Sequence, residues 1–120
     1  MKLEEVYGIT LVGNCDLALI QRCASFEGLS TKEVFNTIAL RIAHEFQKEA
    51  LTFEDADFAI NDLWSAIVDY TFTDEFDTKL SEPAYSIYDA FDQGEYTHKD
   101  GKDPVEFHTK RLLLEVTGGT

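Results

Sequence analysis

The sequence is poor in the residues that carry the most recognisable chemistry. Its 120 positions hold two cysteines, two prolines, three histidines and one tryptophan, and only ten lysines and arginines. On a single helix Cys15 and Cys23 would lie about 12 Å apart, which is too far for a disulfide bond. We therefore expect both thiols to be reduced and mostly in the core, as is typical of a cytoplasmic protein.

Long hydrophobic runs are also missing. No apolar stretch approaches the ~20 residues that a membrane-spanning helix needs. The first ten residues, MKLEEVYGIT, contain two acids and no long apolar segment, so we do not expect a secretory signal. With 44% hydrophobic and 12% aromatic residues, the chain can still build the core of one domain. These features predict a cytoplasmic protein without a membrane partner.

Motifs for catalysis and for metal or cofactor binding are absent as well. There is no HExxH pair, no Gly-x-Ser-x-Gly elbow and no glycine-rich phosphate loop. The acidic fragments at 55–57 and 74–77 lack the glycine and the closing glutamate of a calcium loop. The sequence has three histidines, His44, His98 and His108. Their spacing suits neither a metal site nor the activation of a nucleophile. We expect a protein that is not an enzyme and needs no metal or cofactor.

Positive charge is scarce, and negative charge is concentrated in one part of the chain. The net charge is −13. Residues 54–106 carry fifteen acids and three lysines, a net of −12, while residues 1–53 net −2 and residues 107–120 net +1. Direct nucleic-acid binding is disfavoured, because it needs a basic surface. A cationic partner and simple solubility both remain explanations of this acidity.

What the sequence does contain is a series of capped segments with a helical period. Apolar residues recur every three to four positions in five segments, which predicts amphipathic helices. Starts are marked by Asn14 or Asp16, the Ser30–Glu33 capping box, Thr52, Ser81 with Pro83, and Asp103 with Pro104; stops are marked by Gly28, Gly94 and Gly118. The pattern indicates an all-α fold, a single-domain bundle of five or more helices spanning residues 1–120.

Other segments are less regular. The first dozen residues alternate poorly, so we expect an extended or irregular lead-in there. Phe72 and Phe76 have no clean period and are expected to anchor the 71–80 segment in the core. In the 53–70 helix, Trp64 and Val68 fall on the inward stripe, so Trp64 is expected to be largely buried.

The stretch 88–103, YDAFDQGEYTHKDGKD, stands out because it mixes aromatic rings with acids at a helix end and in a polar loop. Acids near a helix C-terminus oppose the helix dipole, so stability alone explains them poorly. Tyrosine supplies rigid contact area of the kind found at binding hot spots. We predict a partner-binding face that also includes the acids at 74–77: Asp74, Glu75, Asp77, Asp89, Asp92, Glu95, Tyr96, Asp100 and Asp103. Ordinary packing of Tyr88 and Tyr96 at the core edge is the alternative.

The segment IYDAFDQGEYTHKDGKDPVEFHTKRLL resembles small acidic helical immunity proteins of bacterial toxin–immunity systems, in particular those of contact-dependent growth inhibition. The resemblance covers about residues 81–115. It implies a cytoplasmic protein that binds and neutralises a cognate toxin, in particular a ribonuclease. A nuclease cleft is cationic because it binds phosphates, so an acidic inhibitor would complement it.

Three classes of function therefore stay open at this point. The first is the immunity-type inhibitor, and the second is an acidic nucleic-acid mimic or another protein-interaction module. The third is an enzyme or metal-dependent helical protein. The Asp55, Asp62 and Asp69 stripe of the 53–70 helix is the alternative interface.

Overall fold

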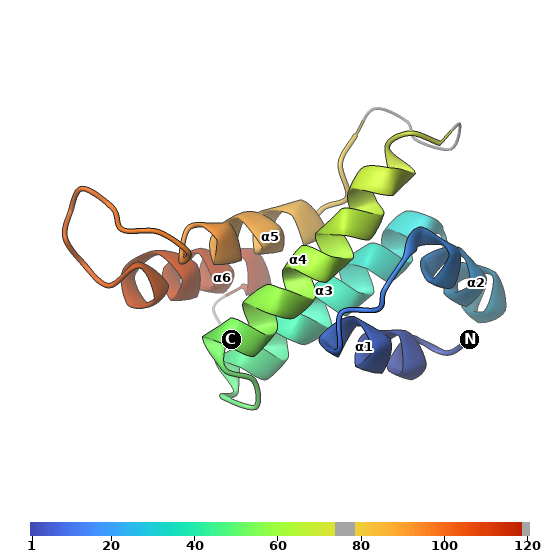
Figure 1. Cartoon of the computed structure of the whole chain (residues 1–120), viewed down its shortest axis with the longest axis horizontal. Coiled ribbons are helices and arrows are strands. Elements are labelled where there is room, and N and C mark those ends of the chain that lie inside the picture. The colour runs from blue at the N-terminus through green and yellow to red at the C-terminus, as the bar shows by residue number, and fades with distance from the viewer. Residues whose placement is uncertain (74–78, 119–120) are drawn as a thin grey trace.

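The computed structural model describes residues 1–73 and 79–118, and all regular secondary structure within those ranges is helical (Figure 1). The elements are α1 (Leu3–Leu11), α2 (Leu17–Glu27), α3 (Thr31–Gln47), α4 (Phe53–Tyr70), α5 (Ala84–Asp92), the π-helical turn η1 (Val105–Thr109) and α6 (Lys110–Thr117). This confirms the prediction of an all-α protein with five or more helices. None of the helices in the described ranges is long and apolar enough to cross a membrane.

The two longest helices, α3 and α4, form the centre of the molecule. Helices α1 and α2 pack on one side of this pair, and each contacts both α3 and α4. Helix α5 contacts both α3 and α4 on the other side, with η1 and α6 against it (Figure 1). Every helix thus buries one face against the central pair or against a neighbour that touches it.

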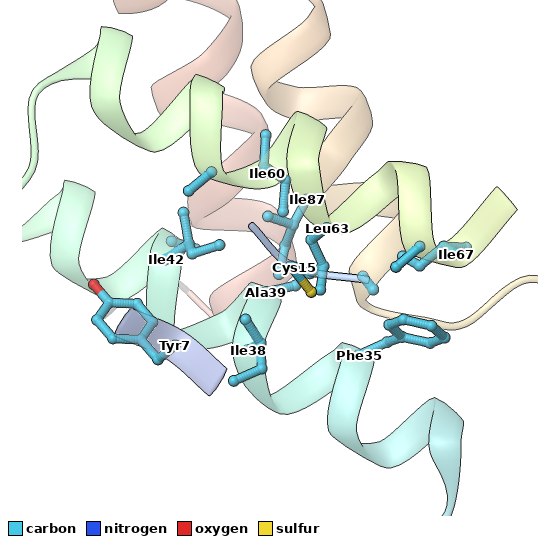
Figure 2. Packing of buried hydrophobic residues seen from close by; sticks show 14 of the residues in the cluster. Tyr7, Cys15, Phe35, Ile38, Ala39, Ile42, Ile60, Leu63, Ile67 and Ile87 are labelled. Atoms are coloured by element: carbon cyan, nitrogen blue, oxygen red, sulfur yellow. The ribbon is translucent and has the colours of Figure 1, made fainter. Parts of the chain in front are cut away.

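The core lies where the apolar stripes of α3, α4 and α5 meet. Figure 2 shows the side chains of α4 facing those of α3, with Ile87 of α5 beside them. The buried stripes match those expected from the helical period: Phe35, Ile38, Ala39 and Ile42 on α3; Ala56, Ile60, Leu63 and Ile67 on α4; Ala84, Ile87 and Phe91 on α5. Burying a large apolar side chain is worth roughly 1.5–3 kcal/mol, so this three-helix seam is the main source of stability.

The cysteines join this core. Cys15 and Cys23 are both buried and free, as predicted. Cys15 precedes the N-cap of α2, so the two thiols do not share a helix. Burial raises the pKa of Cys15 to about 11, which keeps it a protonated, unreactive thiol at neutral pH.

Most helix ends follow local capping chemistry. Asp16 and Thr52 each accept a hydrogen bond from a backbone N–H three residues on, and Ser30 forms the predicted capping box with Glu33. Gly28 and Gly118 close α2 and α6 with φ of 70° and 83°, a left-handed conformation that costs glycine little.

The start of α5 differs from the prediction. Ser81 does not cap the helix; it is buried, and its hydroxyl has no partner among the described residues. The helix begins at Ala84, whose backbone N–H donates to Asn36 Oδ1 of α3 at 3.1 Å. The cap therefore comes from a residue 48 positions away, which no local pattern could indicate.

The expectation of an extended N-terminal segment is wrong, because residues Leu3–Leu11 form α1. Gly8 and several β-branched residues give this segment low helix propensity, but tertiary contacts compensate. Val6 and Thr10 are fully buried, and the Arg41 guanidinium of α3 lies 4.2 Å above the Tyr7 ring. Arg41 also donates to Glu4 at 2.7 Å, which ties α1 to the central pair.

Two further burial predictions, for Phe72 and Val68, are wrong. Phe72 is 85% exposed, because Tyr70 fills the last core position of α4 and packs edge-on against Phe35. Phe76 lies outside the described residues. Val68 is 38% exposed. Trp64, predicted to be largely buried, packs against the edge of the core and keeps part of its surface exposed.

Candidate partner-binding surface

An aromatic ridge lies where the outer faces of α4 and α5 meet. The Trp64 indole of α4 stacks on the Tyr88 ring of α5 with centroids 4.3 Å apart and planes 10° from parallel. Tyr85, one turn earlier on α5, meets the same indole edge-on at 5.6 Å. All three rings are partly exposed. They form a rigid amphipathic surface of the kind that partner proteins use as an anchor.

Carboxyl groups gather directly beside this ridge. Asp57 and Asn61 precede Trp64 by seven and three positions and so lie on the same face of α4. Asp92 follows Tyr88 by four positions on α5, and Glu95 lies in the turn after that helix. Asn61 Nδ2 donates to Glu95 Oε2 at 3.2 Å, which holds this turn against α4. We call these residues the α4–α5 acidic surface: Asp57, Asn61, Trp64, Tyr85, Tyr88, Asp92 and Glu95.

Two acids of this surface, Asp57 and Asp92, have a raised pKa. Partial burial, a hydrogen bond with Glu95 and the charges of Glu95 and Asp92 raise the pKa of Asp57 from 3.8 to about 7. Partial burial, followed by the charges of Glu95 and Asp89, also raises the pKa of Asp92. None of the three acids forms an ion pair with a described lysine or arginine. The site therefore carries unneutralised negative charge.

Asp57 is the most constrained member. As a carboxylate it would leave Oδ1 buried without a hydrogen-bond partner among the described residues. As a carboxylic acid Asp57 can donate a hydrogen bond to the Glu95 carboxylate, which contributes to its raised pKa. An external cation could replace that proton, and the arrangement can therefore accept a lysine or arginine from a partner.

The structure brings only some of the predicted binding residues into this surface. Asp92 and Glu95 belong to it. Asp89 is partly buried beside Asp92, and its Oδ1 accepts from Gln93 Nε2 at 3.5 Å. Asp74, Glu75 and Asp77 lie outside the described residues, so their prediction stays a prediction.

The remaining predicted acids have local structural partners. Asp103 Oδ1 accepts from the backbone N–H of Val105 at 2.9 Å and caps η1. Asp100 accepts from the N–H of Lys102, which, with His108, lowers the pKa of Asp100. Their local roles make these two acids weaker candidates for contact with a partner.

The loop after α5 is ordered by a stack of rings. His98 lies on His108 of η1, with centroids 3.6 Å apart, and Tyr96 packs on His98 at 4.6 Å. Tyr96 is 48% exposed, and its hydroxyl donates to Gln93 Oε1 at 2.8 Å. Tyr96 is thus presented on a fixed loop, as an aromatic anchor requires, and its own predicted role stays a prediction.

Sequence reasoning missed Asp57, Asn61 and Trp64 as members of this surface. Their spacing at positions 57, 61 and 64 marks one face of α4, which is the available signal. The alternative stripe is partly structural, since Asp62 Oδ2 accepts from the backbone N–H of Cys15 at 2.9 Å. Asp55 and Asp69 are exposed.

Metal-binding geometry does not occur in the part of the chain that the structure describes, where no group of three or more His, Cys, Asp or Glu side chains could hold an ion. The fold and this surface thus define a small all-α protein with an acidic, aromatic-lined face. No protein-family model, curated protein or solved structure matches the chain.

Proposed function

We propose that this protein is an immunity-type inhibitor, which acts in the cytoplasm by binding a basic toxin domain, in particular a ribonuclease, through the α4–α5 acidic surface. The observation that carries the proposal is the convergence of Asp57, Asp92 and Glu95 beside the Trp64–Tyr88 stack, with no ion-pair partner for these acids among the described residues. An acidic inhibitor complements a nuclease cleft, which is basic because it binds phosphates. This role requires no reaction chemistry from the chain.

Two further features support this proposal. The negative charge is concentrated in residues 54–106, which include α4 and α5, and such a field speeds association with a cationic protein. The aromatic ridge offers apolar contact directly beside the charged groups, and aromatic side chains often carry much of the binding energy of an interface. Solubility alone requires neither the convergence of the acids nor their position beside the rings.

The first test uses the gene immediately upstream, where we expect a large secreted protein with a basic C-terminal nuclease domain. That domain should stop growth when expressed alone in a bacterial host, and co-expression of this chain should restore growth. The two proteins should also co-purify. Failure to restore growth, or the lack of such a gene, would contradict the proposal, whereas binding to several unrelated nucleic-acid-binding proteins would favour a nucleic-acid mimic.

The second test locates the interface with matched variants. We expect the D92N/E95Q double variant to bind the toxin domain at least ~10-fold more weakly, equivalent to ~1.4 kcal/mol, with a smaller salt dependence of the association rate. The control is E54Q/E115Q, which removes the same charge from exposed positions outside the surface. Surface plasmon resonance at several salt concentrations measures the affinity and the salt dependence of the association rate for each variant. If the two variants bind the toxin domain equally well, the interface lies elsewhere, and Asp55 and Asp69 are the next positions to test.

A further inference from the structure

A groove lies on another part of the molecule, where the end of α3 and the α3–α4 turn meet η1 and α6. It consists of two adjoining cavities of about 310 and 330 Å³ that share Phe46, Glu49 and Lys110 in their walls. Leu114 and Gln47 complete the first cavity. Each volume is at the lower end of the range for small-molecule sites, so the groove suits a small ligand.

Gln47, which lines the first cavity, has a hydrogen-bond acceptor that the described residues leave unused. Gln47 Nε2 donates to Thr117 Oγ1 at 3.1 Å, while Gln47 Oε1 is buried and has no partner among the described residues. The reverse amide orientation is disfavoured, because the single hydroxyl proton of Thr117 is donated to the Leu113 carbonyl at 2.8 Å. A buried acceptor without a donor costs free energy, which an N–H group of a ligand that reaches it could offset.

A second acceptor stands at the rim. Glu49 follows the last turn of α3 with φ of 64°, a left-handed conformation that is uncommon for a residue with a side chain. Its carboxylate forms no ion pair with any described lysine or arginine. The neighbouring Lys110 ammonium is already bound to Glu106 Oε1 at 2.6 Å. The rim therefore has a carboxylate that forms no ion pair among the described residues, although the charge of Lys110, whose close partner is Glu106, acts on it from a distance.

We propose that this groove binds a small molecule that carries a primary ammonium group on an apolar stem. The ammonium group supplies the N–H donors that Glu49 and Gln47 Oε1 lack, and the stem packs against Phe46 and Leu114. A neutral alcohol would satisfy one acceptor and leave the charge of Glu49 unpaired, while a carboxylate would be repelled by Glu49. We therefore expect the affinity of the groove to decrease from the cation to the neutral molecule to the anion.

The test uses three probes of similar shape on the full chain: phenethylammonium, 2-phenylethanol and 3-phenylpropanoate. Two-dimensional ¹H–¹⁵N NMR titration at pH 7 should show the cation shifting the amide signals around Glu49 and Leu114, with the strongest apparent affinity of the three. The E49Q variant should bind the cation about 5-fold more weakly. E54Q, which removes an exposed acid that lines neither cavity, should bind it like the parent.

Each other outcome contradicts the proposal in a specific way. Equal affinity for the cation and the alcohol would show an apolar groove without recognition of charge. Tighter binding of the anion would show that Lys110, and not Glu49, binds the charged group of the ligand. An equal loss of affinity for the cation in E49Q and E54Q would reflect net charge only. If no amide signal shifts even at the solubility limit of the probes, no site exists. None of these results depends on the toxin-binding proposal, which uses other residues.

Discussion

At the scale of single residues, Asp57 shows how the position of one side chain can oppose folding. Its carboxyl is partly withdrawn from water on the face of α4 and stands beside Glu95 and Asp92. In the folded chain its pKa is raised to about 7, so folding favours the protonated form. The unfolded chain, with an ordinary aspartate, prefers the charged form above pH 4.

This difference predicts a pH dependence of stability. Between about pH 4 and pH 7 the folded state binds more protons at Asp57 than the unfolded state does, so its contribution to the free energy of unfolding falls as the pH rises. Above pH 7 that contribution is constant. Asp57→Asn cannot lose a proton, and we expect it to be more stable than the parent at pH 8 by about 1 kcal/mol, a value reduced for partial solvent screening. Urea unfolding at pH 4.5 and 8 measures it.

The matched control for this experiment is Asp55→Asn, an exposed position in the first turn of α4. Asp55→Asn should change the free energy of unfolding by a similar small amount at both pH values, because the Asp55 side chain is exposed. Parallel pH profiles for the parent and Asp57→Asn would show that Asp57 is an ordinary surface carboxylate.

At the scale of elements, the turn after α5 decides how α5, η1 and α4 fit together. Gly94 in this turn is buried, and a Cβ there would overlap Thr109 Oγ1 and approach the Phe53 ring to 2.9 Å. Thr109 is held in place because its hydroxyl donates to the Ala90 carbonyl at 2.7 Å. The close approach of three elements requires a residue without a side chain, and it also fixes Glu95 next to Asn61.

We therefore expect Gly94→Ala to destabilise the protein by about 2 kcal/mol, because the added methyl group overpacks this contact. Gly8→Ala is the matched control. Gly8 lies inside α1, and a Cβ there meets no atom within 4 Å, so the change should stabilise the helix by about 0.5–1 kcal/mol. Chemical denaturation of both variants gives the comparison, and equal effects would show that the Gly94 contact is loose.

At the scale of the whole molecule, net charge opposes compactness. A charge of −13 on 120 residues repels itself, and the repulsion is strongest where residues 54–106 are brought together on α4, α5 and the loops beside them. Arg41, Lys48 and Lys110 form ion pairs with Glu4, Glu45 and Glu106, none of which belongs to the α4–α5 acidic surface. The fold tolerates this repulsion through its three-helix core.

Screening should therefore stabilise the protein. Raising NaCl from 20 to 500 mM shortens the Debye length from about 20 Å to about 4 Å, and we expect the free energy of unfolding at pH 7.5 to increase by about 1 kcal/mol. The gain should nearly vanish at pH 4.5, close to the isoelectric point of about 4.4, where the net charge is small. A salt effect of equal size at both pH values would point to a cause other than charge repulsion.

The fold was largely predictable because its signals are local. Asp16, Ser30, Thr52 and Gly28 act on backbone groups within a few positions, and the apolar period of α3 and α4 sets which side chains turn inward. The departures from the predicted fold have physical causes as well. Helix α1 forms despite weak propensity because Val6 and Thr10 are buried against neighbouring helices, and Phe72 is exposed because Tyr70 takes the place expected for it.

The sequence by itself determined the all-α class, the locally capped starts of α2, α3 and α4, the burial of the two cysteines and the acidity of residues 54–106. Only the tertiary structure decided that Asp57 meets Glu95, that Asn36 caps α5 and that Gln47 leaves an acceptor unused in a groove. These contacts join residues that are far apart in the chain, and the packing angles of whole helices fix them. Such angles depend on the sum of many side-chain contacts, so no local pattern of residues encodes them.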